Sequence, residues 1–209
     1  IKLNLFKLKS KNDLESVYRF FKKSTLKWFD KNQNPRKEFF HVRGCLLCKS
    51  KSSQEVYKID GFTYHECLSC KSVYTKPHLR NGVLDSLYSD GTYQVYQDRL
   101  VNKGKKLRKG ILEKRKFFQI EKFLKKNLPT LLDVGCGSGT FLDICNKNGW
   151  QVEGVDPSPS VKQKVFEDYK IYVHQGDFNR IKFNKNFDII TMWGVLEHVP
   201  NPLVTMKKV

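Results

Sequence analysis

The sequence is short of acidic side chains and contains no long apolar stretch. Its 209 residues hold 39 lysines and arginines against 21 aspartates and glutamates, which gives a formal net charge of +18. No apolar run approaches the length of a membrane span, and no hydrophobic segment of a secretory signal peptide is present. We therefore expect a cytoplasmic chain without a membrane span.

Arginine is also scarce relative to lysine. Proteins that read a nucleic-acid sequence depend on the fork of donors that the arginine guanidinium provides. A lysine-rich charge is therefore more typical of solvated surfaces than of a nucleic-acid interface, although a nucleic-acid partner stays an alternative. The hydrophobic content of 39% and the aromatic content of 13% are enough for a packed core, which argues against wholesale disorder.

Six cysteines occur without a signal for secretion, which favours free thiols in a reducing compartment over disulfides. Four of them, Cys45, Cys48, Cys67 and Cys70, form two Cys-x-x-Cys pairs separated by 18 residues. Two residues within each pair let both sulfurs reach one ion, and two pairs complete a tetrahedral thiolate site. We predict a zinc ribbon over residues 41–78. Because four thiolates leave no open position on the metal, the zinc should be structural.

The rest of the N-terminal half divides into two segments. Residues 1–40 are basic with apolar side chains at helical spacing, which predicts a helix packed on the main body or, as the alternative, one on a membrane surface. Residues 79–128 contain tyrosines and then a basic helix, predicted from Arg99 to Asn127, that Pro129 stops. The tyrosines are Tyr88, Tyr93 and Tyr96, and we expect them to pack the ribbon against the next domain or to line a pocket.

Residues 129–209 alternate strand-like apolar runs with helical patterns. We predict strands at Thr130–Val134, Gln151–Val155, Lys170–His174 and Phe187–Thr191, and helices at Thr140–Asn148, Ser158–Asp168 and Pro200–Val209. This alternation indicates an α/β domain with a doubly wound, Rossmann-like parallel sheet that binds its ligand at the carboxyl ends of the strands. Since the chain starts at Ile1 and ends at Val209 inside a predicted helix, we expect a fragment of a longer protein.

Three glycines at alternate positions, Gly135, Gly137 and Gly139, follow the first of these strands. Glycine permits a tight turn and a close approach of ligand to backbone, while the following helix presents free N–H groups. A dinucleotide fingerprint would have its third glycine at position 140, where this sequence has Thr140, and the Gly-Lys-Ser/Thr of a P-loop is absent. The pattern therefore argues against a dinucleotide site and against a P-loop. Asp133, just before the turn, would repel a pyrophosphate but suits a ligand with an ammonium group.

Further acids stand where the carboxyl edge of the sheet should lie. Asp156 closes the second strand, roughly at the spacing from the glycine turn at which an acid holds ribose hydroxyls. Asp177 follows the third strand, where it could accept a hydrogen bond from an adenine amino group while Phe178 stacks on the ring. Each acid alone could be a helix cap, but their common position at strand ends favours a nucleoside site.

From Leu131 to Val209 the sequence resembles the class I S-adenosylmethionine-dependent methyltransferases. The run Leu132–Gly139 looks like their first motif, which contacts the methionine moiety, and Phe187–Val199 is similar to their fourth-motif region. The cofactor contacts that this resemblance implies are Asp133, Gly135, Cys136, Gly137, Gly139, Asp156 (ribose), Asp177 and Phe178 (adenine), and Met192. The resemblance also implies a seven-stranded sheet. Since only four strands are visible here, we expect the isolated chain to be inactive.

A narrower resemblance, from Cys45 to about Tyr96, is to bacterial methyltransferases with a zinc-binding N-terminal module. These include sugar C-methyltransferases and relatives associated with cell-surface polysaccharide synthesis, which implies a small-molecule, sugar or nucleotide-sugar acceptor. Glu197 and His198 match the Glu-His pair of the sugar enzymes, and His198 is the expected base because imidazole titrates near neutral pH. Val195 stands where those enzymes would have a helping tyrosine, which is a departure from their pattern.

Three other functions stay open. The Glu-His pair also occurs in quinone-type O-methyltransferases. Some rRNA guanine methyltransferases join a zinc module to this fold, and the charge of +18 would suit RNA. Against RNA, the tetrapeptide typical of amino-group methylation is absent after the fourth strand, where Met192 to Val195 stand. A non-catalytic zinc-dependent scaffold is the last alternative, and the intact acids argue against it.

Overall fold

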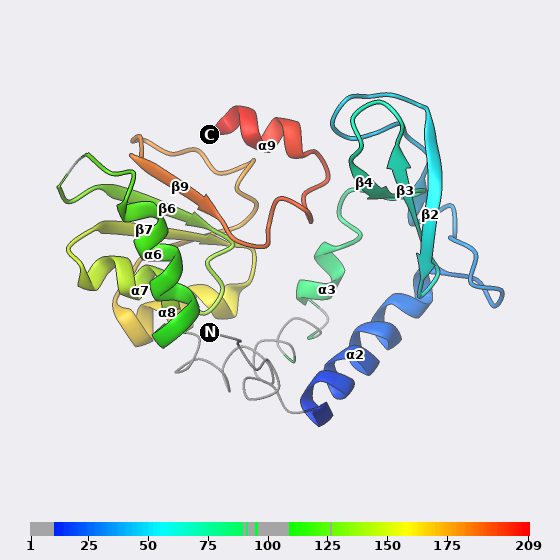
Figure 1. Ribbon diagram of the computed structural model, residues 1–209. Helices are drawn as coiled ribbons and strands as arrows, with labels where there is room; N and C mark the ends of the chain where they lie inside the picture. Colours follow the sequence, from blue (N-terminus) through cyan, green and yellow to red (C-terminus); the bar gives the residue numbers. More distant parts are fainter. Residues whose placement is uncertain (1–10, 90, 92–94, 96–108, 126) are drawn as a thin grey trace. The chain divides into compact units, whose positions relative to one another are not determined.

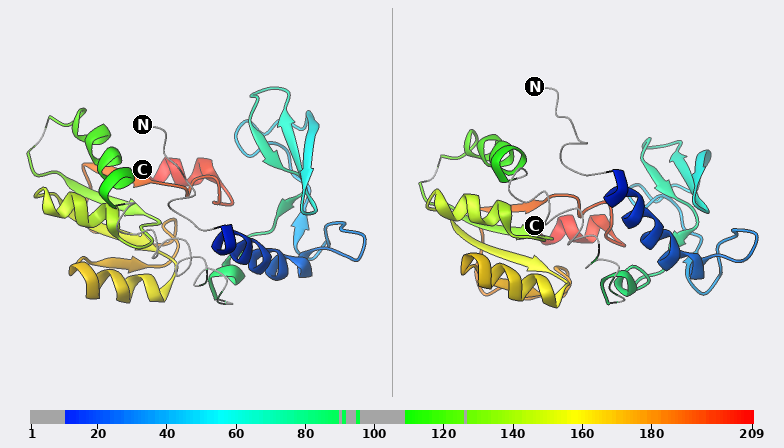
Figure 2. Two further views of the ribbon diagram at one scale, coloured as in Figure 1. Left: turned by 60° about the horizontal axis from the view of Figure 1, so that its bottom comes forward. Right: turned by 90° about the horizontal axis from the view of Figure 1, so that it is seen from below.

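The computed structural model describes residues 11–89, 91, 95, 109–125 and 127–209, and the chain divides into two compact units. One consists mainly of Tyr18–Thr92 and the other mainly of Tyr93–His198. Figure 1 and Figure 2 show the elements of both units. The predicted Tyr93 and Tyr96, the side chain of Tyr88 and the first part of the helix predicted from Arg99 lie outside the described residues. The domain boundaries expected at residues 40, 78 and 128 stay predictions.

The first unit contains an aromatic core at the end of helix α2 (Lys11–Thr25) and the 3₁₀ turn η1 (Leu26–Trp28). The predicted N-terminal helix is confirmed, but it ends well before the expected stop at residues 32–35. Phe29 takes an extended conformation instead, because its ring turns into the core with that of Trp28. The core is completed by Phe40 and Leu87, which come from β1 (Phe40–His41) and α3 (Asp85–Ser89).

Three antiparallel strands in the order β2-β3-β4 form the body of the cysteine-rich segment (Figure 1). They are β2 (Ser53–Ile59), β3 (Phe62–Cys67) and β4 (Val73–Thr75), with β5 (His78–Leu79) pairing with β1. Strands β2 and β3 join through Asp60 and Gly61, both at positive φ, as in a tight hairpin turn. The hydroxyl of Tyr18 on α2 donates to the Asp60 carboxylate at 2.8 Å.

The second unit is built on a parallel sheet of four strands in the order β8-β7-β6-β9. The strands are β6 (Thr130–Val134), β7 (Gln151–Asp156), β8 (Val173–Gln175) and β9 (Ile189–Met192). The chain runs outward from β6 to β8 and then returns to the other side of β6. The strand order therefore reverses at β6, which creates a topological switch point between β6 and β9. The predicted parallel sheet is confirmed.

Two strands begin later than predicted. β8 does not begin at Lys170, because Lys170 takes a left-handed conformation with a φ of 59° that ends helix α8. β9 begins two residues after Phe187. There the N–H of Thr130 donates to the Asp188 carboxylate at 2.8 Å, and the N–H of Asp188 donates to Oγ1 of Thr130 at 2.9 Å. Side-chain bonds thus replace strand pairing at this end of the sheet.

Helices cover one face of the sheet. They are α6 (Lys114–Glu121), which follows the π-helical turn η3 (Lys109–Glu113), α7 (Thr140–Lys147) and α8 (Pro159–Tyr169). Their core includes Phe117, Leu131, Leu142, Trp150 and Val165. The predicted end of α6 at Asn127 is wrong, because the N–H groups of Phe123 and Leu124 bond to carbonyls three residues back and close the helix. The last helix, α9 (Pro202–Lys208), follows the sheet. Among the described helices, none is long and apolar enough to cross a membrane.

The opposite face of the sheet packs against the connection between β8 and β9, residues 176–188. Leu132, Val134 and Val155 meet Phe178 of this connection in a second core. A doubly wound sheet carries helices on both faces. In the described part of the chain this connection contains no helix, so it packs on this face of the sheet without the helix that a doubly wound fold would have between β8 and β9.

Candidate functional site

The glycine turn lies at the carboxyl end of β6, beside the switch point of the sheet. Gly135, Gly137 and Gly139 have φ values of 72°, 51° and 69°, a region that favours glycine. Space also excludes a side chain at Gly135, because a Cβ atom there would lie 2.3 Å from Cγ2 of Val195. Gly139 is the N-cap of α7, so the free N–H groups of that helix point at the turn. The structure has the close-approach turn that the sequence predicts.

Asp156 closes β7 and reaches across to this turn. One carboxylate oxygen accepts the N–H of Gly137 at 3.1 Å, and the other accepts the N–H of Ser158 at 2.9 Å. The residue is 2% exposed, and burial raises the pKa of its carboxyl to about 6. Each carboxylate oxygen can accept a second hydrogen bond, so Asp156 could still receive hydroxyl donors from a ligand.

Asp133 lies inside β6 and is 3% exposed. Oγ1 of Thr191 on β9 donates a hydrogen bond of 2.6 Å to its carboxylate. Burial raises the pKa of the Asp133 carboxyl to about 7; the Thr191 bond and the Lys116 ammonium oppose this rise, and the Glu113 carboxylate adds to it. An arriving cation would lower this pKa again, so the site suits the ammonium ligand expected from the sequence.

Two charged residues near Asp133 belong to no motif that the sequence shows. Glu113 ends the π-helical turn, Lys116 lies in the first turn of α6, and Oε2 of the first is 2.8 Å from Nζ of the second. The Lys116 ammonium also lies 4.8 Å from the ring centre of Trp193, which follows β9. In the sequence, such a pair three residues apart on a basic helix is indistinguishable from a solvated surface ion pair. No sequence signal separates the two cases.

The loop after β8 carries the predicted adenine pair. The Asp177 side chain is half exposed, and its carboxylate accepts the N–H of Asn179 at 2.9 Å. Phe178 is only 5% exposed and packs in the second core, with its ring centre 5.9 Å from that of Phe183. These are the contacts of a core side chain, and the stacking role expected for Phe178 stays a prediction.

The remaining predicted cofactor contacts, Cys136 and Met192, lie on the two strands of the switch point or next to them. The Cys136 thiol is buried against the backbone of β7, and burial raises its pKa well above the usual value. Met192, the last residue of β9, is partly buried in the second core. Both residues are therefore packing side chains, and neither offers a charged group to a ligand.

Glu197 and His198 lie in the turn that follows β9, and both are exposed. The backbone N–H of His198 donates to the carbonyl of Val195 at 2.9 Å, which fixes the turn. Because Val195 itself contacts the glycine turn at Gly135, the Glu-His pair is on the same edge of the sheet as that turn. Its catalytic role stays a prediction.

The four predicted metal ligands come together in the first unit. All four Sγ atoms lie within 4.8 Å of one another, and the pairs Cys45–Cys70 and Cys48–Cys67 are each 3.5 Å apart. A tetrahedral zinc ion with Zn–S bonds of about 2.3 Å holds its sulfurs about 3.8 Å apart. The spacing of the thiols therefore fits a single ion.

The two cysteine turns have the same backbone hydrogen bonds. Cys45 donates its N–H to the carbonyl of Ser50 and accepts the N–H of Lys49, while Cys67 does the same with Ser72 and Lys71. Both lysines have positive φ, at 66° and 62°. At Gly44, a Cβ atom would lie 2.6 Å from the carbonyl oxygen of Ser50, so the first turn leaves no room for a side chain. Two such matching turns are typical of a structural zinc site.

A parallel sheet whose order reverses beside a three-glycine turn, with buried acids at its carboxyl edge, defines an α/β domain of the nucleoside-binding class. Residues 104–209 match the model of a family described as a methyltransferase domain. The match covers a little more than half of the sequence, and the chain belongs to this methyltransferase domain family.

Curated relatives resemble a shorter stretch. The ubiquinone biosynthesis O-methyltransferase of Coxiella burnetii (strain RSA 493 / Nine Mile phase I) is 37% identical over 82 residues, which cover 34% of this chain and 33% of the relative. The enzyme of the same name from Haemophilus ducreyi is 33% identical over 84 residues, 35% of this chain and 36% of the relative. The chain thus spans about a third of the length of these curated relatives. Among solved structures, the PH0226 protein of Pyrococcus horikoshii OT3 is 27% identical over 50% of this chain and 51% of its own, with a TM-score of 0.42.

Proposed function

We propose that the chain binds S-adenosylmethionine at the glycine turn and takes part in methyl transfer to a small-molecule acceptor. The observation that carries this proposal is the pair of buried carboxylates beside the turn, Asp156 at the end of β7 and Asp133 within β6. When bound, S-adenosylmethionine supplies an electrophilic methyl group on a sulfonium. Asp156 would hold the ribose hydroxyls, and the glycine turn would admit the ligand against the backbone. Asp177 would accept a hydrogen bond from the adenine amino group.

Calorimetry with S-adenosylhomocysteine tests the cofactor site. Asp156→Ala should abolish measurable binding, because it removes the buried acceptor beside the turn while the sheet keeps its core. Asp168→Ala, at an exposed position of α8, is the control for charge and should bind like the unmodified chain. Circular dichroism checks that both variants fold. Unchanged affinity in Asp156→Ala would contradict the proposal.

The acceptor we propose is a sugar or nucleotide sugar in cell-surface glycan synthesis, as the cysteine module and the Glu-His pair suggest. His198 would take the acceptor proton, with Glu197 beside it. A hydroxylated aromatic acceptor is the second candidate, because the curated relatives are named ubiquinone biosynthesis O-methyltransferases. Calorimetry with nucleotide sugars, catechols and RNA, each added to the chain in the presence of S-adenosylhomocysteine, separates these acceptors by binding and needs no turnover. Binding of catechols or RNA alone would overturn the sugar assignment.

We also propose that Cys45, Cys48, Cys67 and Cys70 bind one structural zinc ion. Metal analysis should find one zinc per chain, and Co²⁺ should bind in its place with the absorption bands of tetrahedral thiolate coordination. Cys45→Ser should lose the metal, whereas Cys145→Ser, which changes a buried thiol of the other unit, should keep it. Zinc-free protein, or equal zinc in both variants, would remove the assignment.

A further inference from the structure

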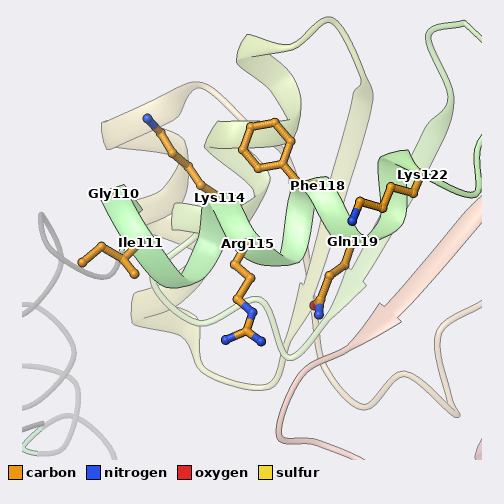
Figure 3. A pocket seen from close by; sticks show the side chains of 7 residues that line it. All are labelled: Gly110, Ile111, Lys114, Arg115, Phe118, Gln119 and Lys122. Carbon is orange, nitrogen blue, oxygen red and sulfur yellow. The ribbon is translucent and has the colours of Figure 1, made fainter. Parts of the chain in front are cut away.

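The outer side of helix α6 carries exposed apolar and basic side chains next to one another. Phe118 is 54% exposed, and Ile111, in the preceding turn η3, is 42% exposed. Lys114, Arg115 and Lys122 are exposed as well, and Figure 3 shows these side chains around an open surface pocket. Since Lys114 and Lys122 lie four residues before and after Phe118, they are its neighbours on the helix surface. These five residues are called the outer face of α6 below.

The packing of the helix does not account for the apolar members of this face. The inner side of α6 packs on the sheet through Phe117, which is 2% exposed, and through the partly buried Ile120. Phe118 contacts Phe117, with ring centres 5.6 Å apart, but its own side chain stays more than half exposed. Single exposed apolar side chains are common, whereas neighbouring ones with polar groups around them mark interaction sites.

The charges of the outer face have one sign. Within the described part of the chain, no acid forms an ion pair with Lys114, Arg115 or Lys122. Glu113 on the same helical segment is turned inward, with its side chain 3% exposed, and the exposed Glu121 is not among the residues that line the pocket. Three cations are therefore available to an anionic partner.

The shape of the face favours an extended partner. All residues that line the pocket come from one helical segment, residues 110–122, whereas a small-molecule site encloses most of its ligand. RNA is held by arginine forks and by several stacking rings, and this face offers one arginine and one ring. A lipid bilayer accepts apolar side chains at the boundary between headgroups and acyl chains, and anionic headgroups attract lysines. The combination of Ile111, Phe118 and the lysines therefore fits a bilayer best.

Helix α8 has an equally exposed ring with a different charge around it. Phe166 is 54% exposed, like Phe118, but the exposed acids Glu167 and Asp168 directly follow it. Nζ of Lys170 already lies 5.3 Å from the centre of the Phe166 ring. Acids at this place repel an anionic surface. The α8 ring therefore serves as a matched control for the ring on α6.

We propose that the outer face of α6 docks the chain on the surface of an anionic lipid bilayer. The helix lies along the bilayer surface, with Ile111 and Phe118 at the boundary between headgroups and acyl chains. Lys114, Arg115 and Lys122 lie among the anionic headgroups. The inference is independent of the cofactor and of the acceptor, because it involves neither the glycine turn nor the Glu-His pair.

Co-sedimentation of the full chain with lipid vesicles tests this surface. The chain should bind vesicles of equal parts phosphatidylglycerol and phosphatidylcholine, and it should not bind vesicles of phosphatidylcholine alone. The variant Lys114→Gln/Arg115→Gln/Lys122→Gln should bind the anionic vesicles about a hundredfold more weakly, since each basic residue near an anionic surface contributes roughly a factor of five.

Control variants separate this face from the overall charge of the chain. Lys162→Gln/Lys164→Gln/Lys182→Gln removes the same charge from exposed positions of the same unit. At physiological ionic strength it should bind within about twofold of the unmodified chain, because charges away from the bilayer are screened. Phe118→Ser should weaken binding about tenfold, and Phe166→Ser should leave it unchanged. Circular dichroism checks that each variant folds.

Two results would overturn the proposal among these variants. Equal losses in the two charge variants would show that binding follows net charge alone, and full binding by Phe118→Ser would show that no ring enters the bilayer. A chain that binds single-stranded RNA but no anionic vesicle would assign the face to nucleic acid instead. Should Phe118→Ser fail to fold, the two charge variants still decide, because they change only exposed side chains.

Discussion

Replacement of Asp133 by asparagine should stabilise the ligand-free chain at neutral pH. The side chain is buried in β6, where Oγ1 of Thr191 donates to it at 2.6 Å. Asparagine keeps the shape of the side chain and an oxygen that can accept this bond, but it removes the negative charge. The charge is unfavourable here because burial and the nearby carboxylates of Glu113 and Asp156 raise the pKa of Asp133 to about 7.

The magnitude follows from proton linkage. Between pH 3.8 and about 7 the folded chain binds the Asp133 proton more tightly than the unfolded chain, so its contribution to stability falls as the pH rises through this window. At 1.36 kcal/mol per pH unit, the full loss is about 4 kcal/mol above pH 7. Asp133→Asn avoids this loss of stability, because asparagine carries no charge. Its free energy of unfolding should equal that of the unmodified chain at pH 4 and exceed it by at most about 4 kcal/mol at pH 8.

Urea unfolding of both proteins at pH 4, 6 and 8 measures this difference. The exposed Asp168→Asn variant controls for the change of net charge. A gain of stability without function is common at ligand sites, and here we expect the gain to be accompanied by weaker S-adenosylhomocysteine binding, because the ligand ammonium loses a nearby negative charge. A difference between the two proteins that is independent of pH, or a loss of stability in Asp133→Asn at pH 8, would refute the account of Asp133 as a buried, destabilising acid.

Two further variants test the turn and the loop. Gly135→Ala should lose about 1–3 kcal/mol of stability and its ligand affinity, because φ is 72° and the new Cβ would lie 2.3 Å from Val195. In urea unfolding, the double variant Gly135→Ala/Val195→Ala should recover part of this stability. Gly110→Ala is the control, because a Cβ atom at Gly110 would meet no atom within 4 Å. Phe178→Leu keeps apolar volume in the second core. If Phe178 has only a core role, this variant should lose less than about 1.5 kcal/mol of stability and keep its S-adenosylhomocysteine affinity, measured by calorimetry. A large loss of affinity would instead show that the ring stacks on adenine.

Much of the fold was predictable because its signals are local. Alternating apolar strands and helices predicted a parallel sheet, and four paired strands confirm it. The ends of the elements were less predictable, because they depend on single hydrogen bonds. Lys170 ends α8 in a left-handed conformation, and Asp188 replaces strand pairing at the start of β9 with bonds to Thr130. No local pattern in residues 176–188 predicts that they cover a face of the sheet without a helix.

The sequence by itself determined the glycine turn and the cysteine cluster. A left-handed turn needs glycine at given positions, and two cysteines three residues apart can reach one ion whatever the rest of the chain does. Only the tertiary structure decided which side chains surround these motifs. It buried Phe178 in a core, and it brought Glu113 and Lys116 from a helix before β6 to Trp193 after β9. Such contacts between residues far apart in the sequence depend on strand order and on how each helix is rotated about its axis. Neither property is encoded within a few neighbouring residues.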